Sequence, residues 1–173
     1  MTWKKYTLEE RKEIYSRPLE EQFVRVYEDG EAVVLRHLIR STEAEDYGIV
    51  LEVAKALAGE KRGHVWILPE INKHETALRD ALGLSTSNGY TPDLMMSIGS
   101  FVDVKSPESV DKISANACKS SRQGGVVCIT DHSTILKENQ IDRYSRWVLD
   151  SQGYLFEEAF FFINGQLYKR TKE

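Results

Sequence analysis

The chain has 173 residues, of which 41% are hydrophobic and 29% are charged, and its formal net charge is −4. These values predict a single globular domain with a hydrophobic core. The acidic balance counts against a broadly basic nucleic-acid-binding surface, although a local basic patch can act within an acidic chain. No apolar run is long enough to span a membrane, and the polar N-terminus (MTWKKYTLEERKE) is unlike a secretory signal. We therefore expect no membrane partner.

The cysteine content limits the metal and redox classes. Only Cys118 and Cys128 are present, and His132 follows Cys128 by four residues, but no second ligand pair completes a zinc-finger spacing. Two thiols in a chain without a secretory segment predict a reducing cytoplasm. The initial Met and the charged first helix favour a complete gene product.

In the first half of the chain, apolar periodicity and capping signals predict helices alternating with strands. Thr7 and Glu10 form a capping box at the start of the first helix. Asp29-Gly30 between two apolar runs predicts a hairpin turn. Ser41 or Thr42 is expected to cap the second helix, whose apolar residues follow helical spacing. The expected elements are a helix over 7–17, a hairpin over 23–39, a helix over 42–59, a buried strand over 64–70 and a short helical segment over 75–83.

In the second half, strands and helices continue to alternate. Ser106 with Pro107 at the next position predicts a helix start. The aromatic run 160–162 buries both faces of its strand, which indicates a central strand or an edge that pairs with a partner chain, as in a homodimer. The expected elements are strands over 93–98, 101–106, 124–130 and 155–163, helices from 106 and over 139–151, and a hairpin turn at Asn164-Gly165.

This order predicts an α/β (α+β) fold with one mixed central sheet flanked by helices. No internal repeat, linker or low-complexity stretch divides the chain. We expect one domain over residues 1–173, in which residues 1–40 are an accessory part and residues 41–173 form the core.

Two neighbouring strands carry the residues with the clearest chemistry. In FVDVKS, alternation places Asp103 and Lys105 on one face of the strand and Val102 and Val104 on the other. Asp93 begins the preceding strand, and a tight turn at Gly99 can bring it close to Asp103. Two carboxylates and a backbone carbonyl make an oxygen site suited to Mg²⁺. Such a metal lowers the pKa of a bound water and neutralises charge on a phosphate, and Lys105 would position the water or the phosphoryl oxygens.

The spacing Pro92-Asp93, nine residues, Asp103-Val104-Lys105 resembles the PD-(D/E)xK nuclease superfamily. The helix before it and the helix and strand after it are similar to that superfamily's α-β-β-β-α-β core, a restriction-endonuclease-like arrangement. Residues 47–129 look most like the C-terminal toxin nucleases of contact-dependent growth inhibition proteins, through Leu68-Pro69-Glu70, Gly99 and Gln123 as well. The resemblance covers about half of the chain.

The resemblance implies a nuclease with a divalent metal, Mg²⁺ first and Mn²⁺ or Zn²⁺ as alternatives. Its substrate would be RNA, with tRNA as one example, more than DNA. A bacterial, phage or mobile-element origin and a cognate inhibitor protein follow from the same resemblance. Glu70 would be a third acid for the metal.

Further candidates have a structural explanation beside the functional one. Glu43 lies within the apolar stripe of the second predicted helix, so it points inward; it or Asp46 would match the superfamily's helix acid, although the helix dipole also favours an acid there. Gln123 and Arg122 close the helix after Lys105, where Gln123 would orient Lys105 or a phosphate, or simply end the helix.

Histidines and cations form a weaker set. His74 is a candidate base for a metal-free ribonuclease, and His64 flanks the same strand. Trp147 with Tyr144 is expected to be core rather than a base-stacking platform. Cations that would line a phosphate-binding surface, or form an ordinary solvated face, are Lys119, Arg122, Arg143 and Arg146.

Three functions stay open. The first is a metal-dependent nuclease. The second is a metal-independent ribonuclease of the barnase, EndoU, colicin or RelE type, in which Lys105, His74 and Arg122 would act, and the third is an interaction domain that has lost activity. Metal dependence of cleavage separates the first two.

Overall fold

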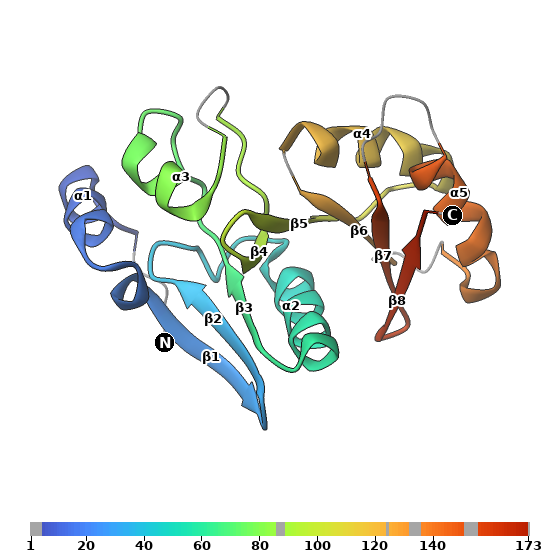
Figure 1. Cartoon of the computed structure of the whole chain (residues 1–173), viewed down its shortest axis with the longest axis horizontal. Coiled ribbons are helices and arrows are strands. Elements are labelled where there is room, and N and C mark those ends of the chain that lie inside the picture. Colours follow the sequence, from blue (N-terminus) through green and yellow to red (C-terminus); the bar gives the residue numbers. More distant parts are fainter. Residues whose placement is uncertain (1–4, 86–88, 124, 132–135, 151–155, 173) are drawn as a thin grey trace.

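The computed structural model describes residues 5–85, 89–123, 125–131, 136–150 and 156–172, and for Arg122 and Gln123 the backbone only. Helices and strands alternate along most of the chain (Figure 1). The helices are α1 (Leu8–Ser16), α2 (Tyr47–Lys61), α3 (Thr76–Leu82), α4 (Ile113–Gln123) and α5 (Ile141–Leu149). The strands are β1 (Phe23–Asp29), β2 (Ala32–His37), β3 (His64–Ile67), β4 (Leu94–Ser97), β5 (Ser100–Lys105), β6 (Val126–Thr130), β7 (Glu158–Ile163) and β8 (Gln166–Thr171).

All eight strands belong to one mixed sheet, and their order in the sheet is their order in the chain. The parallel pairs are β2 with β3, β5 with β6, and β6 with β7; the other neighbours are antiparallel. Each parallel pair is joined through a helix, as parallel strands require. The mixed α/β class and the single central sheet are therefore confirmed, and residues 1–40 contribute two of the strands.

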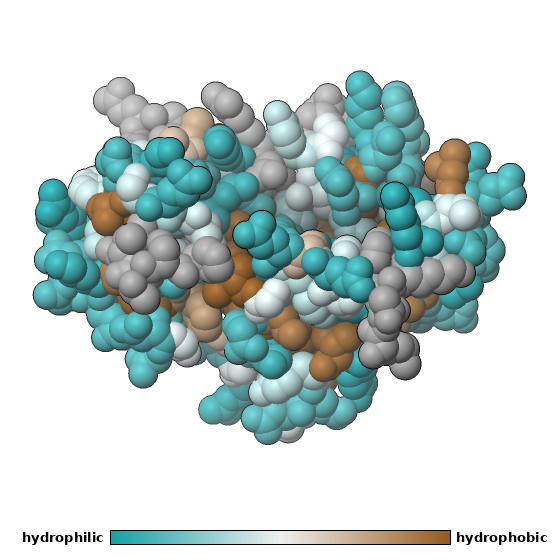
Figure 2. Space-filling model, turned by 180° about the vertical axis from the view of Figure 1, so that it is seen from behind, coloured by the Kyte–Doolittle hydropathy of each residue, from teal (hydrophilic) through white to brown (hydrophobic). Residues whose placement is uncertain are grey.

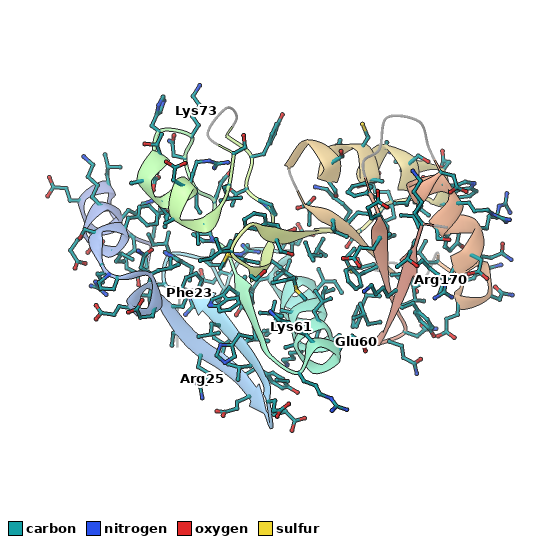
Figure 3. All side chains as sticks on the ribbon, in the orientation of Figure 1. Phe23, Arg25, Glu60, Lys61, Lys73 and Arg170 are labelled. Carbon is teal, nitrogen blue, oxygen red and sulfur yellow. The ribbon has the colours of Figure 1, made fainter. Side chains whose placement is uncertain are left out.

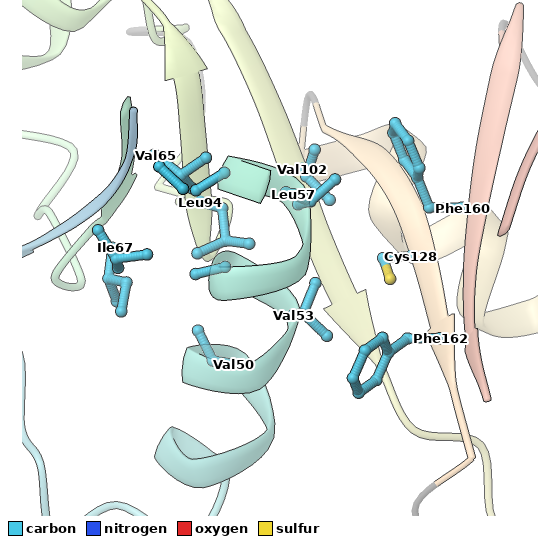
Figure 4. Packing of buried hydrophobic residues seen from close by; sticks show 14 residues of the cluster. Val50, Val53, Leu57, Val65, Ile67, Leu94, Val102, Cys128, Phe160 and Phe162 are labelled. Atoms are coloured by element: carbon cyan, nitrogen blue, oxygen red, sulfur yellow. The ribbon is translucent and has the colours of Figure 1, made fainter. Parts of the chain in front are cut away.

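Helix α2 covers one face of the sheet (Figure 4). Its residues Val50, Val53 and Leu57 are buried against side chains from strands β2 to β7. Phe160 and Phe162 of β7 belong to this cluster, while Phe161 points to the opposite face. The aromatic run thus fills both faces of a strand that lies between β6 and β8, one of the two positions that the sequence indicates.

The other face is covered in two parts. Helices α4 and α5 pack on β6 and β7 around Val127, Ile129 and Phe161. Helix α3 packs on β4 and β5 around Leu82, Met95 and Phe101. Figure 1 shows α3 and α4 on the same side of the sheet, on either side of the central strands. The β4–β5 pair therefore lies where these two cores meet.

Several boundaries follow the sequence and others do not: the strand expected over 64–70, for example, ends at Ile67. The capping box of Thr7 and Glu10 is present at α1, and the turns at Gly30 and at Asn164-Gly165 join antiparallel strands as expected. Helix α2 begins at Tyr47 rather than after Ser41 or Thr42, because residues 41–46 form bends and turns instead. Ser106 does not cap a helix: its hydroxyl hydrogen-bonds to Thr130 on β6, and α4 begins only at Ile113 after a 3₁₀ turn.

The surface is mostly hydrophilic. Figure 2 shows the face opposite to Figure 1, where hydrophobic residues appear near the centre and in the lower half among polar ones. Charged side chains such as Arg25 on β1 and Lys73 before α3 point away from the chain (Figure 3). Within the ranges that the structure describes, no helix has both the length and the apolar character needed to cross a membrane.

Helix α3 and the β4–β5 turn touch through two glycines. Gly83 ends α3 in the left-handed region (φ 79°), and a Cβ there would lie 2.8 Å from the Cα of Gly99. The N–H of Gly99 also donates to the carbonyl of Leu82 at 2.9 Å. Only a residue without a side chain allows this approach, which fixes the hairpin against α3.

We expect Gly83→Ala to destabilise the fold, because the left-handed backbone alone costs about 1 to 2 kcal/mol for an L-residue and the clash with Gly99 adds to it. Chemical denaturation measures the loss. Gly59→Ala is the matched control: Gly59 lies in α2 with open space around its Cα, so alanine should raise stability by up to about 1 kcal/mol. Equal effects of the two changes would contradict this reading.

Candidate active site

Asp93, immediately before β4, lies beside Asp103 of the adjacent strand β5. Leu94 pairs with Val102 in the antiparallel β4–β5 register, so the next pair outward is Asp93 with Asp103. The Oδ2 atom of Asp93 accepts a hydrogen bond from the N–H of Val104 at 2.8 Å, which holds the carboxyl group against β5. The structure thus brings together the two acids that the sequence places on neighbouring strands.

Asp103 has two partners on the α4 side of the sheet. Its Oδ2 atom accepts from the Ser120 hydroxyl of α4 at 2.9 Å and lies 3.0 Å from the Lys105 ammonium. Asp103 is only 2% exposed, whereas the Lys105 side chain is 19% exposed. The predicted pleat is confirmed, because Val102 packs on the α2 side while Asp103 and Lys105 share the opposite face.

The environment of Asp93 opposes ionisation. Burial, the largest cause, and the neighbouring Asp103 carboxylate together raise its pKa to about 7, although the hydrogen bond from Val104 works in the opposite direction. The charge of Asp46 adds a smaller upward effect. Two carboxyl groups this close are therefore poised to share a proton or to bind a cation.

The backbone around the acids is tightly packed. A Cβ on Gly125 would lie 3.1 Å from the Asp103 nitrogen, 3.2 Å from its Cβ and 3.4 Å from the Cβ of Pro92. These contacts are closer than most van der Waals contacts, so a side chain on Gly125, just before β6, would push against both acid-bearing segments. Pro92 is buried in this contact.

A pocket of about 280 Å³ opens beside Asp93. Its charged lining residues are the acids Asp46, Glu70 and Asp93 and the cation Arg40, whose guanidinium lies 3.4 Å from Asp46. The segment that carries Glu70 is joined to Asp93 by a hydrogen bond from the N–H of Leu68 to the Asp93 carbonyl at 2.9 Å. Glu70 thus lines the same pocket as Asp93 but is itself exposed.

A buried arginine holds the walls of this pocket together. Arg79 of α3 has no exposed surface, and its guanidinium donates to the carbonyls of Ile71 (2.8 Å), Ser85 (2.7 Å) and Tyr90 (2.5 Å). The Thr91 hydroxyl both accepts from the N–H of Ile71 (3.1 Å) and donates to its carbonyl (3.3 Å). These bonds connect the residues next to Glu70 with the residues before Asp93.

The remaining predicted residues are less closely involved. Glu43 was expected to point inward from the first turn of the second helix; this is wrong, because it is exposed and precedes α2. Asp46 also precedes the helical residues of α2, but it lines the pocket.

The side chains of Arg122 and Gln123 lie outside the described parts. His64, His74, Lys119, Arg143 and Arg146 are exposed, and Tyr144 is buried, as expected of a core residue.

The donor set suits a hydrated divalent ion better than a protein cage. Among the described residues, no group of three or more His, Cys, Asp or Glu side chains is placed to hold a metal. Asp93 and Asp103 alone supply two adjacent carboxylates whose mutual repulsion a cation would relieve. Mg²⁺ keeps several waters and commonly binds through one or two carboxylates, so the pair fits it.

The roles of three residues at the site could not be predicted from the sequence. Ser120, Arg79 and Thr91 act through contacts between segments distant in the chain. The only signal for Arg79 is its position in a helix among apolar neighbours, Leu78 and Leu82, where a charged residue needs partners. Nothing in the local sequence of Ser120 distinguishes it from a surface serine.

Comparisons with family models, with curated proteins and with solved structures found no match to this chain.

The raised pKa of Asp93 makes stability depend on pH. The folded protein binds this proton more tightly than the unfolded chain, whose Asp pKa is near 3.8, so the stabilisation is complete below that value and is lost as the pH rises through about 7. Asp93→Asn keeps an acceptor for Val104 but cannot ionise. We expect it to become more stable relative to the native protein as the pH rises from about 4 to about 8. Urea denaturation across this range measures the difference, and exposed Asp80→Asn should leave it flat.

We expect Arg79→Met to lower the free energy of unfolding by about 3 kcal/mol, because it leaves the buried carbonyl of Ile71 and the partly buried carbonyls of Ser85 and Tyr90 without their charged donor. The exposed Lys73→Met on the same segment is the control and should cost no more than about 0.5 kcal/mol. Thermal and chemical unfolding of both variants provide the comparison. A fully stable Arg79→Met protein would show that the guanidinium does not brace the pocket.

Proposed function

We propose that this protein is a divalent-metal-dependent nuclease that hydrolyses phosphodiester bonds in RNA. The observation that carries the proposal is the Asp93–Asp103 pair, with Lys105 3.0 Å from Asp103. Two acids and a lysine at the ends of adjacent central strands form a compact group in which each member has a role in phosphoryl chemistry.

The order of elements supports a restriction-endonuclease-like core as the finer description of the fold. With helix α3 set aside as an insertion between β3 and β4, the order α2, β3, β4, β5, α4, β6 is α-β-β-β-α-β, and β5 and β6 are parallel. The Pro92-Asp93 motif lies immediately before β4, and the Asp103-Val104-Lys105 motif lies at the end of β5. This agreement between motif and topology is the reason to prefer the PD-(D/E)xK interpretation.

Asp93 and Asp103 would hold the metal, and Glu70 lines the pocket from which a third carboxylate or its bound water would approach. The chemistry that a divalent ion would supply there is a bound water of lowered pKa and a positive charge against the developing negative charge of a phosphate. Asp93 would have to give up the proton that its surroundings favour in order to hold a cation, so metal binding and proton release would be linked.

The Lys105 side chain is partly exposed, so its ammonium group is accessible to a substrate phosphate. Its ammonium is anchored by Asp103, which is buried and fixed in turn by Ser120. The partly exposed lysine can donate hydrogen bonds to a phosphoryl oxygen or orient an attacking water without moving. Ser120 therefore acts on Lys105 only through Asp103.

The similarity of the motifs to toxin nucleases extends the proposal to RNA as the substrate, to a cytoplasmic site of action and to a cognate inhibitor protein as a partner. These extensions rest on the sequence motifs alone. The charges of the pocket lining do not add to them, because acidic residues outnumber basic ones there.

The test is incubation of the purified protein with total RNA and with plasmid DNA, with and without Mg²⁺. We expect Mg²⁺-dependent cleavage that Lys105→Met and the isosteric Asp103→Asn each reduce on the order of 10² to 10⁴-fold, the range of a lost catalytic group. The exposed Lys112→Met should keep full activity. Circular dichroism and thermal unfolding establish that the variants are folded.

Two outcomes would overturn the proposal. Cleavage by folded Asp103→Asn protein that EDTA does not inhibit would favour the metal-independent ribonuclease. No cleavage of either substrate and no binding of Mg²⁺ or Mn²⁺ by the native protein would favour the interaction domain.

A further inference from the structure

Tyr90 places an exposed aromatic ring beside the candidate site. It lines the pocket that contains Asp93 and Glu70, and it is 52% exposed. The other large hydrophobic side chains that are exposed in the described residues are all aliphatic: Leu8, Val24, Val26 and Ile98. The one aromatic among them therefore lies three residues from the candidate metal-binding acid Asp93.

The backbone that carries this ring is fixed although the ring is exposed. The Tyr90 carbonyl accepts from the buried Arg79 guanidinium at 2.5 Å, and the next residue, Thr91, is bonded twice to Ile71. A tyrosine has only two side-chain torsions, so a ring on a fixed backbone loses little entropy when it contacts a ligand. This is the arrangement of a preformed stacking platform rather than of a loose surface residue.

The charge of the pocket limits the interactions through which a nucleic acid can bind there. Its ionisable lining is Asp46, Glu70 and Asp93, with Arg40 as the single cation, and Arg40 is already paired with Asp46. Affinity for a nucleic acid at this place therefore cannot come mainly from phosphate contacts, on which duplex binding depends. Base stacking on an aromatic ring supplies affinity without charge and without sequence preference.

The size of the pocket points the same way. About 280 Å³ is just below the usual range for small-ligand pockets, so the pocket suits a group as small as a single nucleobase. In a duplex, both faces of each base are covered by its neighbours, so a ring can stack on a base only if the base is unpaired or extruded.

We propose that Tyr90 stacks on an unpaired base next to the scissile phosphate and restricts the site to single-stranded segments of nucleic acid. This inference rests on the proposed nuclease function and names its substrate class. Tyr90 is a substrate-binding residue in this account, and Asp93, Asp103 and Lys105 carry the chemistry.

The experiment uses a short RNA that contains one 2-aminopurine, either single-stranded or annealed to its complement. Binding is measured in the Lys105→Met background, so that the probe is not consumed, through the quenching of 2-aminopurine by a stacked aromatic ring. We expect tighter binding and stronger quenching for the single strand. Tyr90→Ala should weaken single-strand binding about ten-fold or more and abolish the quenching, because stacking on one ring is worth that much.

Two further variants separate stacking from surface exposure. Tyr90→Phe keeps the ring and should bind within about two-fold of the parent protein. Ile98→Ala removes an apolar side chain that is 65% exposed on the β4–β5 turn but does not line the pocket, and it should change nothing. In cleavage assays without the Lys105 substitution, Tyr90→Ala should raise KM with kcat little changed.

The outcomes distinguish this inference from the proposed function. Cleavage by the native protein together with unchanged affinity and quenching in Tyr90→Ala overturns the role of Tyr90 and leaves the nuclease in place. Equal affinity for duplex and single strand overturns the restriction to unpaired bases. Selective, Tyr90-dependent binding without any cleavage supports Tyr90 and removes the nuclease.

Discussion

The register of the β4–β5 hairpin is the constraint on which the candidate site depends. A shift by one residue would turn Asp103 and Lys105 to the α2 side and separate Asp93 from both. Three features hold the register: the Leu94–Val102 pairing, the hydrogen bond from Val104 to Asp93, and the contact of Gly83 with the Gly99 turn. The last of these connects the hairpin to α3 and so to Arg79.

The same register is electrostatically unfavourable, because it brings two carboxyl groups together away from solvent. It places two carboxyl groups together in a partly buried position, where the pKa of Asp93 rises to about 7. Ser120 and Lys105 compensate Asp103, but for Asp93 the structure describes one backbone donor, Val104. An arrangement that is unfavourable for folding yet surrounded by specific braces is the pattern expected of a functional site rather than of a structural ion pair.

Much of the fold could be predicted from the sequence because its signals are local. The capping box at Thr7, the Asp29-Gly30 turn and the alternation in FVDVKS each depend on a few neighbouring residues. The start of α2 was mispredicted because Ser41 and Thr42 are good caps, while the chain there instead forms turns that place Arg40 and Asp46 at the pocket. Ser106 was mispredicted for a similar reason, since its hydroxyl bonds to Thr130 on a strand 24 residues away.

The site could be predicted in part. Asp93, Asp103 and Lys105 follow from pleat and turn, but the braces around them follow from tertiary contacts alone. Arg79 and Thr91 reach segments 8 to 20 residues distant, and Gly125 is needed only because β6 passes close to Asp103 and Pro92. Hydrophobic periodicity in the sequence does not predict contacts between segments that are separated in the chain.

The identity of strand order and chain order has a consequence for how the protein forms. Each strand pairs only with the strand before it and the strand after it, so no pairing has to wait for a distant part of the chain. Contacts between near neighbours in sequence close early and favour rapid folding. A chain that emerges from the ribosome N-terminus first can extend its sheet one strand at a time. Both acids would then be in place before the last three strands are synthesised, and Asp103 would gain Ser120 only when α4 follows.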